Sequence, residues 1–141
     1  MKDIAVRIKR VIFALVLISG VTACTSDDDL KEIFIDREWK LTYINDGSVK
    51  RYTKNSIYSV KFFDGSFKVS MPGGASIDGK WRANAKTREF QCSGIRTGGN
   101  FTGDTLAQKM LQIFTNAKKY SGDTNWLQIK QNDNTYMQFY N

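Results

Sequence analysis

The feature that most constrains this fold is the Asp64-Gly65 dipeptide, which lies between two runs of alternating apolar and polar residues. Asp-Gly in such a setting is a strong signal for a two-residue β-hairpin turn. A three-residue loop would instead set Lys61 against Val69 and break the alternation of the two faces. The two-residue register places apolar residues opposite each other: Phe62 with Phe67, Val60 with Val69, and Tyr58 with Met71.

The same register sets Lys61 opposite Lys68 on the outer face of the hairpin. Like charges directly across a strand pair are mildly destabilising. We therefore expect an offsetting group, either a neighbouring acid such as Asp78 or an anionic partner.

Further alternating runs predict more strands on both sides of this hairpin. Trp39, Leu41 and Tyr43 alternate with polar residues up to a turn at residues 45–48. A strand over 76–84 and its return over 88–95 place Ile77, Trp81, Phe90 and Cys92 inward. A last hairpin around Asn132-Asp133-Asn134 pairs Ile129 with Met137 and Leu127 with Phe139 inside, and Lys130 with Tyr136, Gln128 with Gln138 and Trp126 with Tyr140 outside.

One helix is predicted over residues 103–118, before the last hairpin. Its apolar residues recur at helical spacing: Leu106, Met110, Ile113, Phe114 and Ala117. Thr105 and Gln108 fit a capping box, and Asp104 suits the positive end of the helix dipole. The fold class is therefore α+β and mainly β: a small antiparallel curled sheet or partly open barrel, with one helix before the C-terminal hairpin.

The first thirty residues have the layout of an export signal. Basic residues precede an uncharged run from Val11 to Ala23, which at about 1.5 Å per residue covers roughly 20 Å and is short for a bilayer core. The ending Val21-Thr22-Ala23-Cys24 resembles the lipobox of bacterial lipoproteins, which implies a lipid on Cys24. A simple secretory signal and a single-span anchor are the alternatives.

This interpretation divides the chain into a signal peptide (1–23), a lipidated cysteine with an acidic tether (24–32) and one β domain (33–141). Asp27, Asp28 and Asp29 resemble the acidic signal that sends some Gram-negative lipoproteins to the cell surface. We expect a lipid-anchored protein of the Gram-negative outer membrane, with the membrane as its partner through the anchor. Nucleic acid is not expected at that location.

Composition bounds the mature chain. Four basic residues and Asp3 leave with the signal, so 118 residues remain, with 17 Lys and Arg against 13 Asp and Glu. That length suits one domain with a core of its own. If Cys24 is acylated, Cys92 lacks a partner, and we interpret Cys92 as a small buried hydrophobe. A Cys24–Cys92 disulfide is the competing account.

Enzyme chemistry has little support in the sequence. The chain contains no histidine, which is the usual general base near neutral pH and the commonest metal ligand. The glutamates have no paired spacing, and Cys92 lacks an activating base. We expect no catalysis, no cofactor and no metal.

Four basic residues form the candidate binding site. Lys61, Lys68, Lys80 and Arg82 alternate with core residues and so project from one outer face. That face is either an ordinary solvated surface or a patch for anionic envelope polysaccharide or lipid headgroups.

From Trp39 onward the chain resembles the META-type domains of bacterial envelope proteins. The resemblance rests on Glu38-Trp39-Lys40-Leu41, on Gly79-Lys80-Trp81, and on the helix and final hairpin. It implies an envelope-associated, stress-related module and supplies no catalytic residues. Many members carry Gly-Gly-Cys-Asn where this chain has Gly73-Gly74-Ala75-Ser76, so no role of that cysteine transfers.

Two functions follow from the sequence. The first is a noncatalytic membrane-anchored lipoprotein that binds or supports other envelope components. The second is a lipocalin-like carrier of a small apolar ligand, which needs an internal pocket of roughly 300 Å³ or more. Without such a pocket the large core side chains should pack together: Phe62, Phe67, Trp81, Phe114 and Phe139.

Overall fold

A computed structural model describes residues 29–47, 50–53 and 57–141 of the chain. Residues 29–34 are helical, and the 3-10 turn η1 spans Pro72–Gly74. The remaining elements, in chain order, are β1 (Glu38–Asp46), β2 (Lys50–Tyr52), β3 (Ser59–Phe62), β4 (Ser66–Ser70), β5 (Ser76–Ala83), β6 (Phe90–Gly98), α2 (Thr105–Thr115), β7 (Lys119–Gly122), β8 (Trp126–Asn132) and β9 (Thr135–Tyr140).

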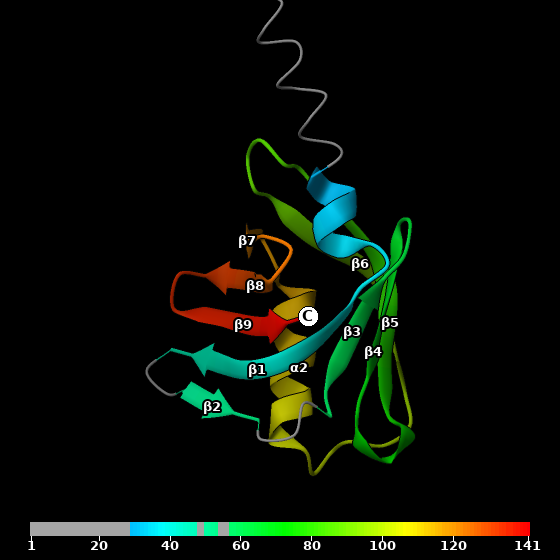
Figure 1. The fold of residues 1–141 in the computed structure, drawn as a ribbon. Helices are drawn as coiled ribbons and strands as arrows, with labels where there is room; N and C mark the ends of the chain where they lie inside the picture. The colour runs from blue at the N-terminus through cyan, green and yellow to red at the C-terminus, as the bar shows by residue number, and fades with distance from the viewer. Residues whose placement is uncertain (1–28, 48–49, 54–56) are drawn as a thin grey trace, which may run out of the picture.

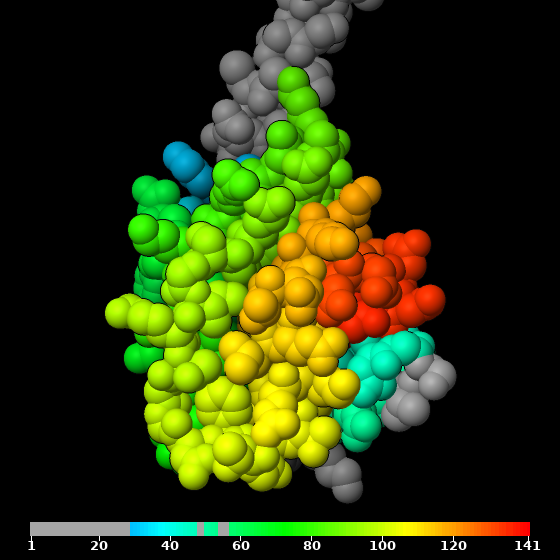
Figure 2. All heavy atoms as spheres, turned by 180° about the vertical axis from the view of Figure 1, so that it is seen from behind, coloured from blue at the N-terminus to red at the C-terminus, as the bar shows by residue number. Residues whose placement is uncertain are grey.

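The strands form one curled antiparallel sheet (Figure 1). Their order is β6-β5-β4-β3-β1-β9-β8-β7, and β2 pairs with β1 beside this path. The two ends of the sheet meet through backbone hydrogen bonds, from Phe90 N to Lys118 O (2.9 Å) and from Tyr120 N to Arg88 O (3.0 Å). Helix α2 lies between β6 and the C-terminal strands, as the view from behind shows (Figure 2). The predicted fold class, mainly β with one helix before the last hairpin, is confirmed.

The β3–β4 hairpin has the predicted register. Val60 pairs with Val69 and Phe62 with Phe67, and these four side chains are buried. Lys61 lies opposite Lys68 on the outer face. On the next strand Asp78 lies opposite Lys68, so the acid expected to offset the two lysines is in place.

Strand β1 departs from the prediction at a β-bulge. Its pairing with β9 shifts between Leu41 and Tyr43, which adds one residue and exchanges the two faces of the strand. The expectation that Tyr43 shares the inner face with Trp39 and Leu41 is therefore wrong. Ile44 is buried in its place, and the Tyr43 side chain lies on the outer face.

The last hairpin keeps every predicted pair, with a shorter turn than expected. Asn132 pairs with Thr135, so only Asp133 and Asn134 form the turn. Asn132, which the sequence places in the loop, joins the strand through a register shift between Lys130 and Asn132.

Helix α2 is capped by Asp104, not by the predicted capping box at Thr105. The Asp104 carboxylate accepts a hydrogen bond from Ala107 N (3.1 Å) and another from the Tyr58 hydroxyl (2.6 Å). The second bond ties the helix start to the chain before β3, which explains why this carboxylate takes the cap. The helix buries Ala107, Met110, Ile113 and Phe114 against the sheet.

A cluster of aromatic rings fills the end of the sheet near residues 29–34. Phe34 lies 4.7 to 5.6 Å, between ring centroids, from Trp81, Tyr120, Phe62 and Phe90. The Trp39 indole donates to Ile33 O at 3.0 Å. Residues 29–32, which we expected to be solvated tether, are helical, because the adjacent Ile33 and Phe34 are anchored in the core.

Candidate functional site

The outer surface of the sheet carries two groups of side chains that are available to a partner. The first, here called the basic face, consists of the four predicted residues Lys61, Lys68, Lys80 and Arg82 on β3, β4 and β5. All four are exposed, and the alternation of each strand places them on the side away from the core.

Acidic side chains interrupt the positive charge of the basic face. One row of outward side chains runs across β1, β3, β4, β5 and β6, with each residue opposite the next: Glu38, Lys61, Lys68, Asp78 and Arg96. Arg96 Nε donates to Asp78 Oδ1 at 3.1 Å. The pair is well exposed, so its contribution to stability is small.

A hollow of about 540 Å³ lies across the middle of this row. Its rim carries the side chains of Lys68, Lys80 and Arg96, with Asp78 among them and Phe63 at one side. Gly79 lies at its base, where a Cβ atom would come within 3.0 Å of the Phe67 ring and 2.9 Å of Ser93 O. The close approach to Phe67 and Ser93 therefore favours glycine at this position.

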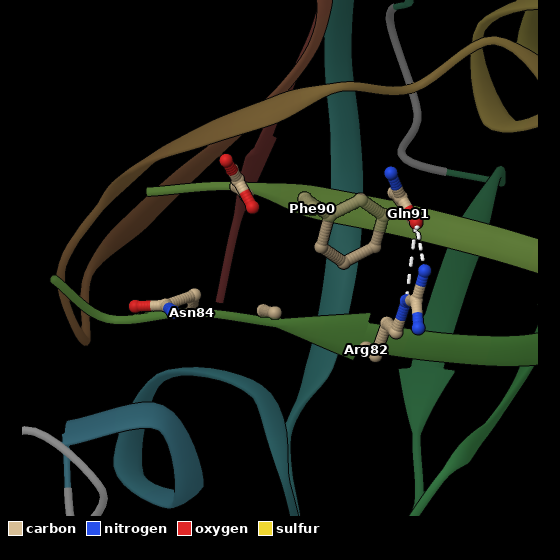
Figure 3. A pocket seen from close by; sticks show the side chains of 6 residues that line it. Arg82, Asn84, Phe90 and Gln91 are labelled. Atoms are coloured by element: carbon tan, nitrogen blue, oxygen red, sulfur yellow. Dashed lines mark hydrogen bonds between the residues drawn. The ribbon is translucent and has the colours of Figure 1, made fainter. Parts of the chain in front are cut away.

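Arg82 lies further along β5, beside a second hollow of about 380 Å³ (Figure 3). Its guanidinium donates twice to Gln91 Oε1 across the strand pair, at 3.1 and 2.6 Å. These bonds hold the cation in place beside Asn84, Glu89 and Phe90.

The second group, here called the aromatic face, covers the outward positions of β2, β9 and β8 and those of β1 from Lys40 onward. One row across these strands reads Tyr52, Tyr43, Gln138 and Gln128. The row on one side of it contains Tyr136, and on the other side Trp126 pairs with Tyr140. Sequence reasoning found the Trp126–Tyr140 pair and the outward glutamines, and it missed Tyr43, Tyr52 and their continuity with the hairpin. The bulge in β1 hid that continuity.

Hydrogen bonds join the centre of the aromatic face. The Tyr43 hydroxyl donates to Gln138 Oε1 at 3.0 Å, and Gln128 Nε2 donates to the same oxygen at 2.7 Å. The Tyr43 and Tyr136 hydroxyls are 3.5 Å apart. The hydrogen bond with Tyr136, together with burial, raises the pKa of Tyr43 to about 12, and the same bond lowers the pKa of Tyr136.

The two cysteines differ in what can be said of them. Cys24 and the export signal lie outside the described residues. Cys92 lies opposite Trp81 on the inner side of β6, and burial raises the pKa of its thiol to about 12. The thiolate is the nucleophilic form, so a raised pKa makes this thiol a weaker nucleophile near neutral pH.

No group of three or more His, Cys, Asp or Glu side chains in the described ranges is placed to hold a metal ion. No helix within the same ranges is long and apolar enough to cross a membrane.

The fold and its two outer faces define a small β module: a curled antiparallel sheet with a packed interior, closed by one helix. The family described as "Domain of unknown function (DUF4847)" matches residues 25–141, and the chain belongs to this family. The resemblance to META-type domains was therefore wrong. The positions that carried it are mostly core positions, which many small β domains share.

A solved structure has a similar fold. The crystal structure of a DUF4847 family protein from Bacteroides vulgatus matches this chain with a TM-score of 0.60 and 21% sequence identity. The match covers 79% of this chain and 96% of that chain. No curated protein matches the chain.

Proposed function

We propose that the protein is a noncatalytic envelope lipoprotein, anchored through Cys24, whose basic face binds anionic lipid headgroups. The observation that supports the proposal is that the basic face begins beside the described N-terminal residues, which are the part of the domain nearest to Cys24 along the chain. Ile35 bridges to Phe62, the neighbour of Lys61, and Asp29 and Glu32 share a hollow with Arg88 of the β5–β6 turn.

Chain length supports this arrangement. Four residues lie between Cys24 and Asp29, and the five Cα-to-Cα steps of a fully extended chain span at most about 18 Å. A lipid on Cys24 therefore confines the first helical residues to the neighbourhood of the membrane surface. Lysines and arginines near an anionic surface contribute about 1 kcal/mol each.

The packed interior favours a binding module over the carrier that we considered from the sequence. Phe62, Phe67, Phe114 and Phe139 are at most 1% exposed. The rings of Phe67 and Phe114 stack with centroids 5.0 Å apart, which joins the sheet to α2. A ligand of drug size would have to displace these side chains.

The anchor is tested by growing cells that express the full chain with labelled palmitate. We expect label on the wild-type protein and a mature chain that begins at Cys24. Cys24→Ala should carry no label. Label that persists in this variant, or a mature chain that begins elsewhere, contradicts the anchor.

The basic face is tested by binding of the full chain to vesicles with and without anionic phosphatidylglycerol. Replacing both Lys80 and Arg82 by Gln should weaken binding to the anionic vesicles, and 0.5 M salt should weaken wild-type binding, because the Debye length falls to about 4 Å. Lys118→Gln, an exposed position outside the face, is the matched control. Equal binding by all three proteins, or binding that salt leaves unchanged, overturns this part of the proposal.

A further inference from the structure

We propose that the aromatic face is a docking surface for an acidic polysaccharide chain. This inference concerns a different part of the sheet from the basic face and does not depend on the lipid anchor. It rests on three properties of the face: exposed aromatic rings, unused amide groups at its centre, and a positive charge that no acid on the face interrupts.

The aromatic rings are spread across a surface of oligosaccharide size. Tyr52 and Tyr140 are 67% and 50% exposed, and Tyr43, Tyr136 and Trp126 are half-buried around them. Four strands lie side by side here, which at about 4.8 Å per strand makes a surface about 14 Å across. The electron-rich face of an aromatic ring attracts the C–H groups on the flat side of a sugar ring.

The amides at the centre match sugar hydroxyls. Gln138 Oε1 accepts from both Tyr43 and Gln128, so its amide NH₂ is left to donate. Gln128 uses its NH₂ in that bond, so its Oε1 is left to accept. Neither of these remaining groups has a partner within the described residues. A donor and an acceptor on adjacent strands suit a pair of neighbouring hydroxyls, which can accept and donate in turn.

The charge on the face indicates an acidic polymer. Lys40 lies opposite Tyr140, Lys130 lies opposite Tyr136, and Lys50 Nζ lies 5.6 Å from the centre of the Tyr43 ring. The described outward positions of β2, β9, β8 and of β1 from Lys40 onward hold no carboxylate. Asp46 of β1 belongs to the other side, where it pairs with Arg51 and with Lys109 of α2.

The same chemistry argues against a membrane. Burying the central amides in lipid would leave polar groups without hydrogen bonds, which is unfavourable. A hydrated, hydroxyl-rich chain satisfies both the rings and the amides.

The test measures binding of the full chain, in detergent micelles, to polygalacturonate by calorimetry, with neutral dextran as the uncharged comparison. We expect binding to polygalacturonate that Tyr52→Ala and Gln138→Ala each weaken about tenfold, the effect of losing one stacking ring or one hydrogen-bonding amide. Phe63→Ala, an exposed aromatic residue outside the face, should bind as the wild type does.

Three results would overturn the proposal. The first is the absence of binding to polygalacturonate. The second is binding that Tyr52→Ala and Gln138→Ala leave unchanged, including binding that depends only on Lys80 and Arg82. The third is equal binding to dextran, which would remove the role of the lysines. Circular dichroism of each variant confirms that a loss of binding is not a loss of fold.

Discussion

The basic face and the aromatic face lie on the outer side of one sheet, and both carry lysines, yet their surroundings differ. On the basic face Lys61 and Lys68 lie side by side between Glu38 and Asp78, and Phe63 is the neighbouring exposed ring. On the aromatic face the lysines flank rings and amides without a carboxylate between them. Net charge alone therefore does not define a binding surface: the groups between the charges decide which polymer fits.

The largest expected effect comes from the core that supports both faces. Phe34 contacts Phe62 and Trp81 behind the basic face and Tyr120 of β7 beyond the aromatic face. Phe34→Ala should lower the free energy of unfolding by about 3–5 kcal/mol, through lost burial and the cavity left behind. Urea denaturation followed by tryptophan fluorescence measures this. A loss below about 1 kcal/mol would mean that residues 29–34 are not part of the core.

A smaller loss of stability is expected from a substitution at Gly79 of β5. A Cβ atom at Gly79 would meet Ser93 O at 2.9 Å and the Phe67 ring at 3.0 Å. Gly79→Ala should destabilise the protein by about 1–3 kcal/mol through overpacking and should leave polygalacturonate binding unchanged. Gly103→Ala, where nothing lies near the added atom, is the control. Equal stability of the two variants would show that Phe67 and Ser93 yield to a side chain at this position.

Alkaline pH probes the tyrosines of the aromatic face, a residue type that the basic face lacks. The pKa of Tyr43 is raised to about 12, and that of Tyr58, beside Asp104, is also raised to about 12, mainly by burial. The usual pKa of a tyrosine is near 10, so the folded state favours the protonated phenols. Their contribution to the stability of the fold is therefore complete below pH 10 and is lost as the pH rises through 12. Burial also raises the pKa of Tyr120, so tyrosinate absorbance should show three late-titrating tyrosines, and Tyr43→Phe should remove one. A titration with every tyrosine near pH 10 contradicts the burial of these phenols and the bond between Tyr43 and Tyr136.

The smallest effect is expected within the charged row. Lys68→Gln removes a repulsion with Lys61 and an attraction to Asp78, so stability should change by less than about 0.5 kcal/mol. Thermal unfolding at low salt measures it. A larger gain in stability would mean that the lysine repulsion outweighs the acid beside it.

The sequence predicted those parts of the fold in which local signals agree. The hairpins at Asp64-Gly65 and at residues 132–134 combine turn residues with unbroken alternation, so their registers followed directly. In β1 the bulge after Leu41 is fixed by pairing with β9, a contact distant in sequence, so the period-2 pattern placed Tyr43 on the wrong face. Half of the aromatic face was hidden for that reason.

The other errors have similar physical causes. Asp104 and Thr105 are both good capping residues, and the hydrogen bond from the distant Tyr58 accompanies the cap at Asp104. The acidic run before Leu30 indicated a solvated tether, whereas burial of Phe34 holds the neighbouring residues in a helix. The placement of Lys61, Lys68, Lys80 and Arg82 on one side needed only strand alternation. The positions of Glu38 and Asp78 beside these residues, and the hollow among them, depend on the order of the strands in the sheet, which strand alternation does not predict.

The most direct test of the account compares two probes with two sets of substitutions. Tyr52→Ala and the joint replacement of Lys80 and Arg82 by Gln are each measured against polygalacturonate and against phosphatidylglycerol vesicles. The account predicts that Tyr52→Ala weakens binding to the polysaccharide alone and that the basic-face variant weakens binding to the vesicles alone. If both variants weaken both interactions equally, the two faces form one nonspecific cationic surface, and the distinction between them is wrong.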